Sequence, residues 1–207
     1  MAGLVAAAVL GLTGCDSGPG TEAAGASGPS VIAPGRPGED NRTLSPDEAE
    51  ARRGDDSPNA ADVAYARMMI RHHAQALEMT ALVPERAAST KVEKLAGRIA
   101  AAQGPEIGAM RGWLKNHGKK EQPGAHGGHG HAGMPGMVSE TRLKDLRAAD
   151  GEAFDRLFLT LMITHHEGAV TMATDVKGQG NNVQIEEMAD DVIAQQTSEI
   201  TRMRELM

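Results

Sequence analysis

The stretch that decides the fold occurs twice in this chain of 207 residues. Residues 68–79 read MMIRHHAQALEM, and residues 161–172 read LMITHHEGAVTM. In both copies methionine, histidine and alanine recur at spacings of three, four and seven residues, which place them on one face of an α-helix. The sequence therefore predicts two helices that carry the same stripe of apolar, imidazole and thioether side chains.

The two copies keep one register over a longer range, because an offset of 93 residues, the separation of His72 and His165, also aligns the segments that follow. The matched pairs are Met69 and Met162, Ile70 and Ile163, His73 and His166, Ala76 and Ala169, Met79 and Met172, Gln103 and Gln196, Glu106 and Glu199, Ile107 and Ile200, and Met110 and Met203. The repeated unit is a helical hairpin. Two hairpins with one apolar stripe each bury those stripes by packing together, so we expect an all-α four-helix bundle made of duplicated hairpins.

The ends of the expected helices follow from local signals. We expect long helices from Asn59 to Pro84, from Thr90 to Gly118, over about 151–177 and over about 182–206, and a short helix that starts at Ser139. Proline cannot continue a helix, so Pro84 marks a boundary and residues 104–105 mark a kink. Glu93 stands three residues after Thr90, which predicts a capping box.

Composition and charge narrow the class of protein. The formal net charge is −7, and aromatic residues make up only 2% of the chain. A core built from Ala, Leu, Ile, Val and Met suits packed helices better than sheets. The acidic balance argues against nucleic acid as a partner, because phosphate binding needs a basic face. The sequence does not identify a protein partner.

The first 58 residues predict targeting rather than a folded domain. Residues 4–12 form an apolar run too short to span a bilayer, and Leu12-Thr13-Gly14-Cys15 resembles a bacterial lipobox. We interpret residues 1–15 as a lipoprotein signal segment with Cys15 lipidated, although no Lys or Arg precedes the run; a chance cysteine after an alanine-rich leader is the alternative. Residues 16–58, rich in Gly, Pro and Ser, predict a disordered tether. The bundle domain, residues 59–207, would then be held outside the cytoplasm, with the lipid as its only membrane contact.

The paired-histidine pattern resembles a known family. Its residues are Met69-Ile70-x-His72-His73-x-x-Ala76-x-x-Met79 and Gln103-x-x-Glu106-Ile107-x-x-Met110, and they resemble the bacterial domain-of-unknown-function family numbered 305. The resemblance covers about residues 59–207, both repeats included. It implies a ferritin-like fold, an extracytoplasmic location and a role in copper binding and copper tolerance.

The two stripes supply candidate metal ligands. These are His72, His73, Met69 and Met79 in the first copy, and His165, His166, Met162 and Met172 in the second. Thioethers bind Cu(I) well and imidazole suits Cu, Zn, Fe and Ni, so this set without thiolate favours copper, Cu(I) above all, and leaves other transition metals open. The alternative is structural, since methionine often fills a core and a buried histidine is often a hydrogen-bonded core residue.

Polar residues of the partner helices are expected beside these ligands. Gln103, Glu106, Gln196 and Glu199 lie on the facing stripes and are expected to orient the histidines by hydrogen bonds. Two alternatives stay open: they satisfy buried polar groups without any metal, or the carboxylates bind a harder metal directly. The Glu-x-x-His pairs of di-iron bundles are absent.

Residues 118–137 form a loop rich in Gly, His and Met, which predicts an auxiliary metal site. Its candidate ligands are His126, His129, His131, Met134 and Met137, and the alternative is a solvated linker between the hairpins. The sequence as a whole predicts a copper-binding or copper-buffering lipoprotein. The alternatives are a metal-dependent oxidoreductase, although no catalytic constellation is visible, and a structural or partner-binding bundle.

Overall fold

The structure, a computed structural model, describes residues 30–35, 38–52, 54–121 and 134–207. The chain divides into two units, Met1–Gly54 and Asp55–Met207. In the first unit, strands β1 (Val31–Ala33) and β2 (Arg42–Leu44) pair antiparallel, with Val31 opposite Leu44, and helix α1 (Pro46–Arg52) follows. Leu44 is the only buried apolar side chain in its described part, so this unit removes little apolar surface from water. The tether predicted for residues 16–58 includes this segment and stays a prediction.

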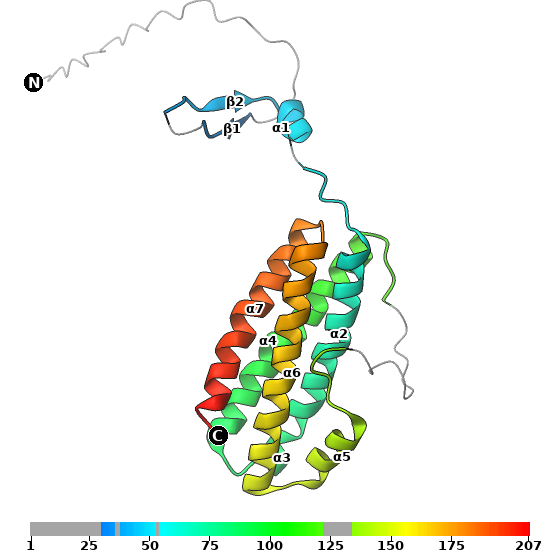
Figure 1. The fold of residues 1–207 in the computed structure, drawn as a ribbon, viewed down its shortest axis with the longest axis vertical. Helices are drawn as coiled ribbons and strands as arrows, with labels where there is room; N and C mark the ends of the chain where they lie inside the picture. Colours follow the sequence, from blue (N-terminus) through cyan, green and yellow to red (C-terminus); the bar gives the residue numbers. More distant parts are fainter. Residues whose placement is uncertain (1–29, 36–37, 53, 122–133) are drawn as a thin grey trace, which may run out of the picture. The chain divides into compact units, whose positions relative to one another are not determined.

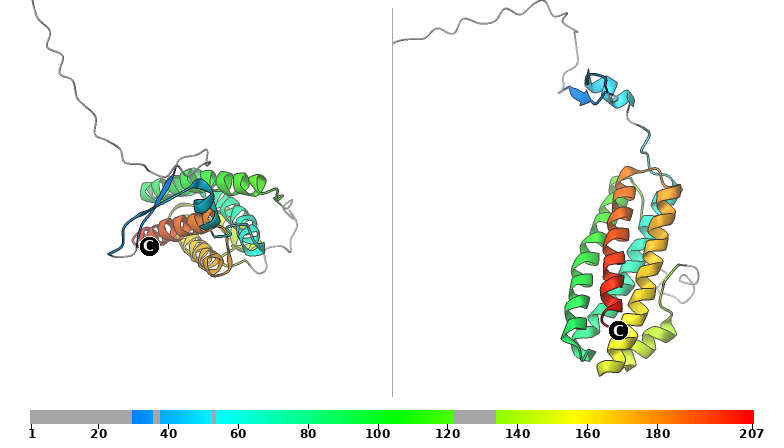
Figure 2. Two further views of the ribbon diagram at one scale, coloured as in Figure 1. Left: turned by 90° about the horizontal axis from the view of Figure 1, so that it is seen from above. Right: turned by 60° about the vertical axis from the view of Figure 1, so that its left-hand side comes forward.

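The second unit is an all-α bundle, as predicted from the duplicated stripes. Its four long helices are α2 (Ala60–Ala81), α4 (Thr90–Asn116), α6 (Gly151–Gln179) and α7 (Val183–Arg204), and the short helices α3 (Val83–Arg86) and α5 (Glu140–Ala148) precede α4 and α6 (Figure 1). Helix α2 packs on α4, α6 packs on α7, and the two hairpins meet through α2 and α6 (Figure 2). Within the described part of the chain, no helix is both long and apolar enough to cross a membrane.

Most helix ends agree with the sequence signals, but Pro84 lies within α3 because the first long helix already ends at Ala81, and α4 continues as one helix through Pro105. The start of α4 also differs. Gly118, with a positive φ of 65°, follows the end of α4 as predicted, and Ser139 caps α5 by accepting a hydrogen bond from the Arg142 amide. The capping box predicted at Thr90 and Glu93 is wrong, because the N-cap residue is Ser89 and its side chain makes no capping bond. The Ser89 amide instead donates to the Asp155 carboxylate of α6 over 2.9 Å.

The start of α7 makes the same kind of contact as the start of α4. The amide of Asn182, the N-cap residue of α7, donates to the Asp62 carboxylate of α2 over 3.2 Å. Asp62 matches Asp155, and Ser89 matches Asn182, at the same offset of 93 residues. In each hairpin the N-cap residue of the second helix is therefore held by an aspartate from the first helix of the other hairpin.

The core consists of two hydrophobic clusters. One cluster holds Met69, Met110, Met134 and Met172; the other holds Met79, Met162 and Met203. Matched methionines thus fall in opposite clusters. Along each long helix, the buried apolar residues on one side of a polar position belong to one cluster and those on the other side belong to the other cluster. The polar positions are the buried histidines on α2 and α6, and the glutamine and glutamate of the repeat on α4 and α7. A polar layer therefore divides the apolar core.

Candidate metal centre

Four histidines form the centre of the polar layer. His72 and His73 come from α2, His165 and His166 come from α6, and all four are fully buried. Helical periodicity places adjacent histidines on the inward face together with the methionines of the stripe. Burying four imidazoles is costly unless their nitrogens find partners.

Two of the histidines are held by carboxylates from the partner helices. His73 Nε2 lies 2.6 Å from Glu106 Oε2, and His166 Nε2 lies 2.8 Å from Glu199 Oε2. In both pairs an Nε2–H donating to the carboxylate leaves Nδ1 as a lone pair. A carboxylate that fixes the tautomer and orientation of an imidazole in this way is the usual companion of a metal-binding histidine.

The other two histidines stack on each other where α2 meets α6. The ring centroids of His72 and His165 are 3.7 Å apart, with 31° between the ring planes. His72 Nε2 lies 3.1 Å from the carbonyl oxygen of Pro135, so an N–H at this position donates to that carbonyl. Burial lowers the pKa of His72 to about 3 and lowers the pKa of His165 well below its ordinary value, helped in both by the neighbouring histidines. Both rings are therefore neutral at physiological pH, the form in which imidazole binds a metal.

Many polar atoms of the layer have no partner among the described residues. They are Nδ1 of His72, His73 and His166, both ring nitrogens of His165, and the amide nitrogen and oxygen of both Gln103 and Gln196. A native core rarely contains so many unsatisfied polar atoms in one place, and a bound water or ion is a recognised explanation. The unpaired imidazole lone pairs fit a borderline or soft metal ion better than a hard one.

The carboxylates and histidines alone do not form a complete ligand shell. Within the described residues, no three His, Cys, Asp or Glu side chains gather closely enough to hold a metal ion. The methionines of the stripes are buried in the clusters on either side of the layer: Met69 and Met172 on one side, Met79 and Met162 on the other. A metal in the layer would therefore combine borderline imidazole with soft thioether donors, and the harder amide oxygens of Gln103 and Gln196 lie in the same layer.

The end of the His-rich loop lies across the layer. We call residues 134–138 the strap. Met134 is buried in the first core cluster, Met137 packs against it, and the Gln75 amide exchanges two hydrogen bonds with the backbone of Val138, at 2.8 and 2.9 Å. The predicted loop ligands His126, His129 and His131 lie outside the described residues, so the auxiliary site stays a prediction.

A close contact between two glycines seats the strap. Gly136 has a φ of 74°, and a side chain there would meet the backbone oxygens of Thr164 and His165 at 2.7 and 2.8 Å. A side chain at Gly168 on α6 would collide with the backbone of Pro135 and Gly136.

Sequence reasoning missed two contacts of this site and one buried polar group near it. They are the carbonyl of Pro135 on His72, the bonds of Gln75 to the strap, and Tyr65, whose buried hydroxyl has no partner among the described residues. Two of them left a signal in the repeat. Tyr65 is the single tyrosine of the chain and matches Phe158, and Gln75 matches Gly168. A mismatch between otherwise parallel copies marks positions where the two halves do different things.

Comparison with solved structures finds relatives of the bundle. A DUF305 fragment from Deinococcus radiodurans is 32% identical, with a TM-score of 0.65, and the match covers 72% of this chain and 96% of that one. A candidate secreted protein of the same family from Streptomyces coelicolor is 33% identical, with a TM-score of 0.64, over 70% of this chain and 91% of that one.

A third relative was solved with bound metal. CopM in its Cu(I)-bound form is 29% identical, with a TM-score of 0.59, over 70% of this chain and 94% of that one. CopM was also solved in Cu(II)-bound and Ag-bound forms. Comparison with functionally curated proteins gave no match. The model of the family described as "Domain of unknown function (DUF305)" matches residues 62–207, and the chain belongs to this family.

Proposed function

We propose that this protein binds copper in the polar layer of its bundle and serves in copper buffering or copper tolerance. The observation that carries the proposal is the set of unpaired imidazole nitrogens in the layer: Nδ1 of three histidines whose Nε2 is held by Glu106, Glu199 or the strap, and both ring nitrogens of His165. The structures of CopM with Cu(I), Cu(II) and Ag support the choice of metal.

The donor types favour Cu(I). His72, His73, His165 and His166 supply neutral nitrogens, and Met69, Met79, Met162 and Met172 supply thioethers from both sides of the layer. Gln103 and Gln196, with unpaired amide groups, complete the surroundings. No thiolate is needed, which suits a compartment in which thiols are readily oxidised.

The proposed location is outside the cytoplasm, at the cell membrane. Cys15 would carry the lipid, and the segment before the bundle would act as the tether. The candidate secreted relative from Streptomyces coelicolor supports the location. Mass spectrometry of the protein purified from its native membrane tests the anchor: a lipid on Cys15 supports it, and an unprocessed leader contradicts it.

The function is tested by competition titration of residues 16–207 with Cu(I). The parent is compared with a variant that carries Ala at His72, His73, His165 and His166, and with a matched variant that carries Ala at His126, His129 and His131. Circular dichroism checks that helicity is kept. We expect tight binding by the parent and by the loop variant and loss of binding in the core variant. Binding that is lost only in the loop variant, or absent from the parent, contradicts the proposal.

A further inference from the structure

A cavity of about 350 Å³ opens beside one of the two histidine–glutamate pairs. Its polar and thioether lining comes from α2, α4 and α7: Tyr65, Glu106, Met110, Met188, Asp191 and Gln195. Helices α4 and α7 are not among the closely packed helix pairs of the bundle, which leaves room for the cavity between them. The Glu106 carboxylate lines the cavity and also lies 2.6 Å from His73 Nε2, so it connects the cavity with the polar layer.

The chemistry of the lining suits a cation. Two acidic residues, Glu106 and Asp191, and two methionines, Met110 and Met188, line the cavity, and the lining residues described for it include no Lys or Arg. Tyr65 is only 1% exposed, yet its hydroxyl has no hydrogen-bond partner among the described residues. A buried hydroxyl without a partner is costly, and an occupant of the cavity would satisfy it.

Several of the positions that correspond to the cavity lining in the other repeat carry different side chains. At the offset of 93 residues, Tyr65 corresponds to Phe158, Asp191 to Arg98, Gln195 to Ala102 and Ala109, also in the lining, to Arg202. The counterpart face therefore carries two arginines in place of an aspartate and an alanine, and it has no phenol. If the repeat were exact, the cavity lining and the counterpart face would carry the same residues. The pair of Tyr65 and Asp191 is therefore specific to the face with the cavity.

We propose that this cavity is the port through which copper ions reach the buried histidines. A cation first docks between Asp191, the Tyr65 hydroxyl and Glu106, and then passes into the polar layer that Glu106 borders, where Nδ1 of His73 has a free lone pair. The proposal rests on the proposed copper function and adds the route to it. The paired carboxylates raise the local cation concentration at the mouth, as charged clefts do for their ligands.

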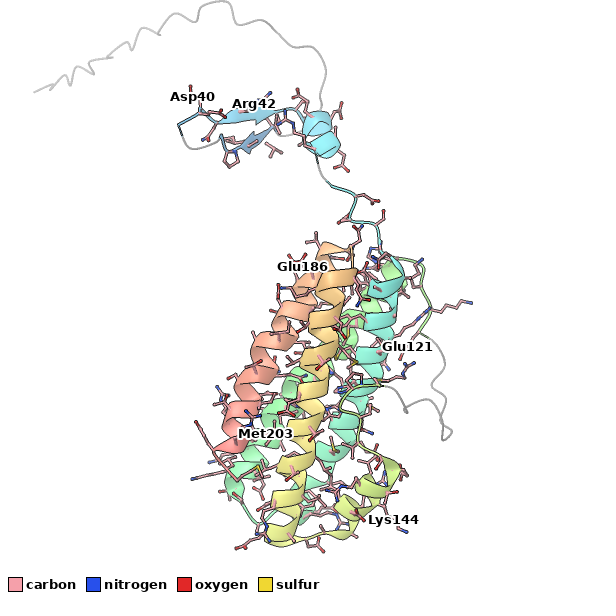
Figure 3. The ribbon with its side chains drawn as sticks, viewed as in Figure 1. Asp40, Arg42, Glu121, Lys144, Glu186 and Met203 are labelled. Atoms are coloured by element: carbon pink, nitrogen blue, oxygen red, sulfur yellow. The ribbon has the colours of Figure 1, made fainter. Side chains whose placement is uncertain are left out.

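The test measures the rate of loading separately from the amount bound. Residues 16–207 are mixed anaerobically with Cu(I) in dilute acetonitrile, quenched with an excess of a competing chelator after set times, desalted and assayed for bound copper. The test variants are Asp191→Asn, Tyr65→Phe and Ala194→Leu; Ala194 is an exposed residue that lines the cavity, so leucine there obstructs it. The matched control is Glu186→Gln, which removes a carboxylate from the start of the same helix, away from the cavity lining (Figure 3).

We expect the double variant Asp191→Asn with Tyr65→Phe to load about tenfold more slowly than the parent, a typical effect of removing charge from a focusing cleft. Ala194→Leu should also slow loading, while all variants reach the copper content of the parent and Glu186→Gln loads at the parent rate. Equal rates in the parent and in every cavity variant overturn the port. A parent that takes up no copper at all instead overturns the proposed function.

Discussion

The two histidine–glutamate pairs of the bundle are equivalent by sequence and different by environment. His73 with Glu106, and His166 with Glu199, are matched at an offset of 93 residues and make the same contact. The Glu106 side chain is 23% exposed and lines a cavity, whereas the Glu199 side chain is 7% exposed. The shared register thus supplies both pairs, and the side chains around them leave Glu106 more exposed than Glu199.

The two central histidines, His72 and His165, also differ, in their hydrogen-bond partners. His72 is held by the Pro135 carbonyl of the strap, and both nitrogens of its counterpart His165 have no partner among the described residues. The strap contacts different residues at the two matched positions. Gln75 on α2 forms hydrogen bonds with it, whereas Gly168 on α6 has no side chain and lets the strap backbone come close. Of the two central rings, His72 is therefore held at one nitrogen and His165 at neither, among the described residues.

The largest expected effect comes from charging the two central rings. Both are neutral in the folded protein, because burial lowers the pKa of His72 to about 3 and that of His165 well below 6.5. In the unfolded chain each takes a proton as the pH falls through about 6.5, so the unfolded state binds more protons below that value. The metal-free protein should thus lose stability from about pH 6.5 downward, by roughly 1.4 kcal/mol per pH unit for each histidine.

Urea titrations over a range of pH check this dependence. The double variant His72→Gln with His165→Gln should show a flatter pH dependence than the parent, whatever its absolute stability. An equally steep loss in the double variant would mean that other groups set the acid limit.

Removing one carboxylate at a time tests the difference between the pairs. Glu106→Ala and Glu199→Ala should each weaken copper binding by roughly 10–100-fold, the usual effect of losing a partner that orients a ligand. Glu199→Ala should also cost about 1–3 kcal/mol of stability, because it leaves the His166 N–H buried without an acceptor. Water can reach the vacated space at Glu106, so its variant should cost less. Equal losses of unfolding free energy for Glu106→Ala and Glu199→Ala, measured by urea titration, would contradict the difference between the two pairs.

The seat of the strap is tested at Gly168. Its substitution by alanine forces the new methyl group against the backbone of Pro135 and Gly136, so we expect a loss of about 1–3 kcal/mol in the free energy of unfolding. Gly108 on α4 is the matched control, since a side chain there meets nothing within 4 Å, and alanine should stabilise the helix by up to about 1 kcal/mol. Thermal melts that shift equally for both would contradict the seat.

The smallest expected effect is that of removing the phenol hydroxyl that one half carries and the other lacks. Tyr65→Phe removes a buried hydroxyl without a partner and should leave stability unchanged or raise it by up to about 1 kcal/mol. The reverse change, Phe158→Tyr, places a hydroxyl in a fully buried position of the second cluster and should lower stability by about 1–3 kcal/mol. Urea midpoints check both, and a destabilised Tyr65→Phe would show that the hydroxyl already has a structural partner.

The architecture could be predicted from the sequence because the repeat is strong. The stripe around His72 and its copy around His165 fix the inward faces, and the matched second helices give the hairpins. The pairing of each second histidine with Glu106 or Glu199 follows from the same register. These features depend only on helical periodicity and on a constant offset.

The asymmetric features could not be predicted in this way. The strap depends on the contact of Gly136 with Gly168, which joins segments of unrelated sequence, and on a backbone carbonyl, which leaves no mark in the identity of Pro135. A local rule predicts the cap of α4 at Thr90 and Glu93, but the Asp155 carboxylate of another helix accepts a hydrogen bond from the Ser89 amide there. Local patterns do not reveal such contacts between distant segments.

The most direct test of the account is anomalous diffraction at the copper edge from crystals of the Cu(I)-loaded protein. The account predicts a copper peak within the polar layer, in contact with Nδ1 of at least one of His72, His73, His165 and His166. Fully loaded crystals whose copper lies only on residues 122–133 or on the protein surface, with the layer empty, would contradict it.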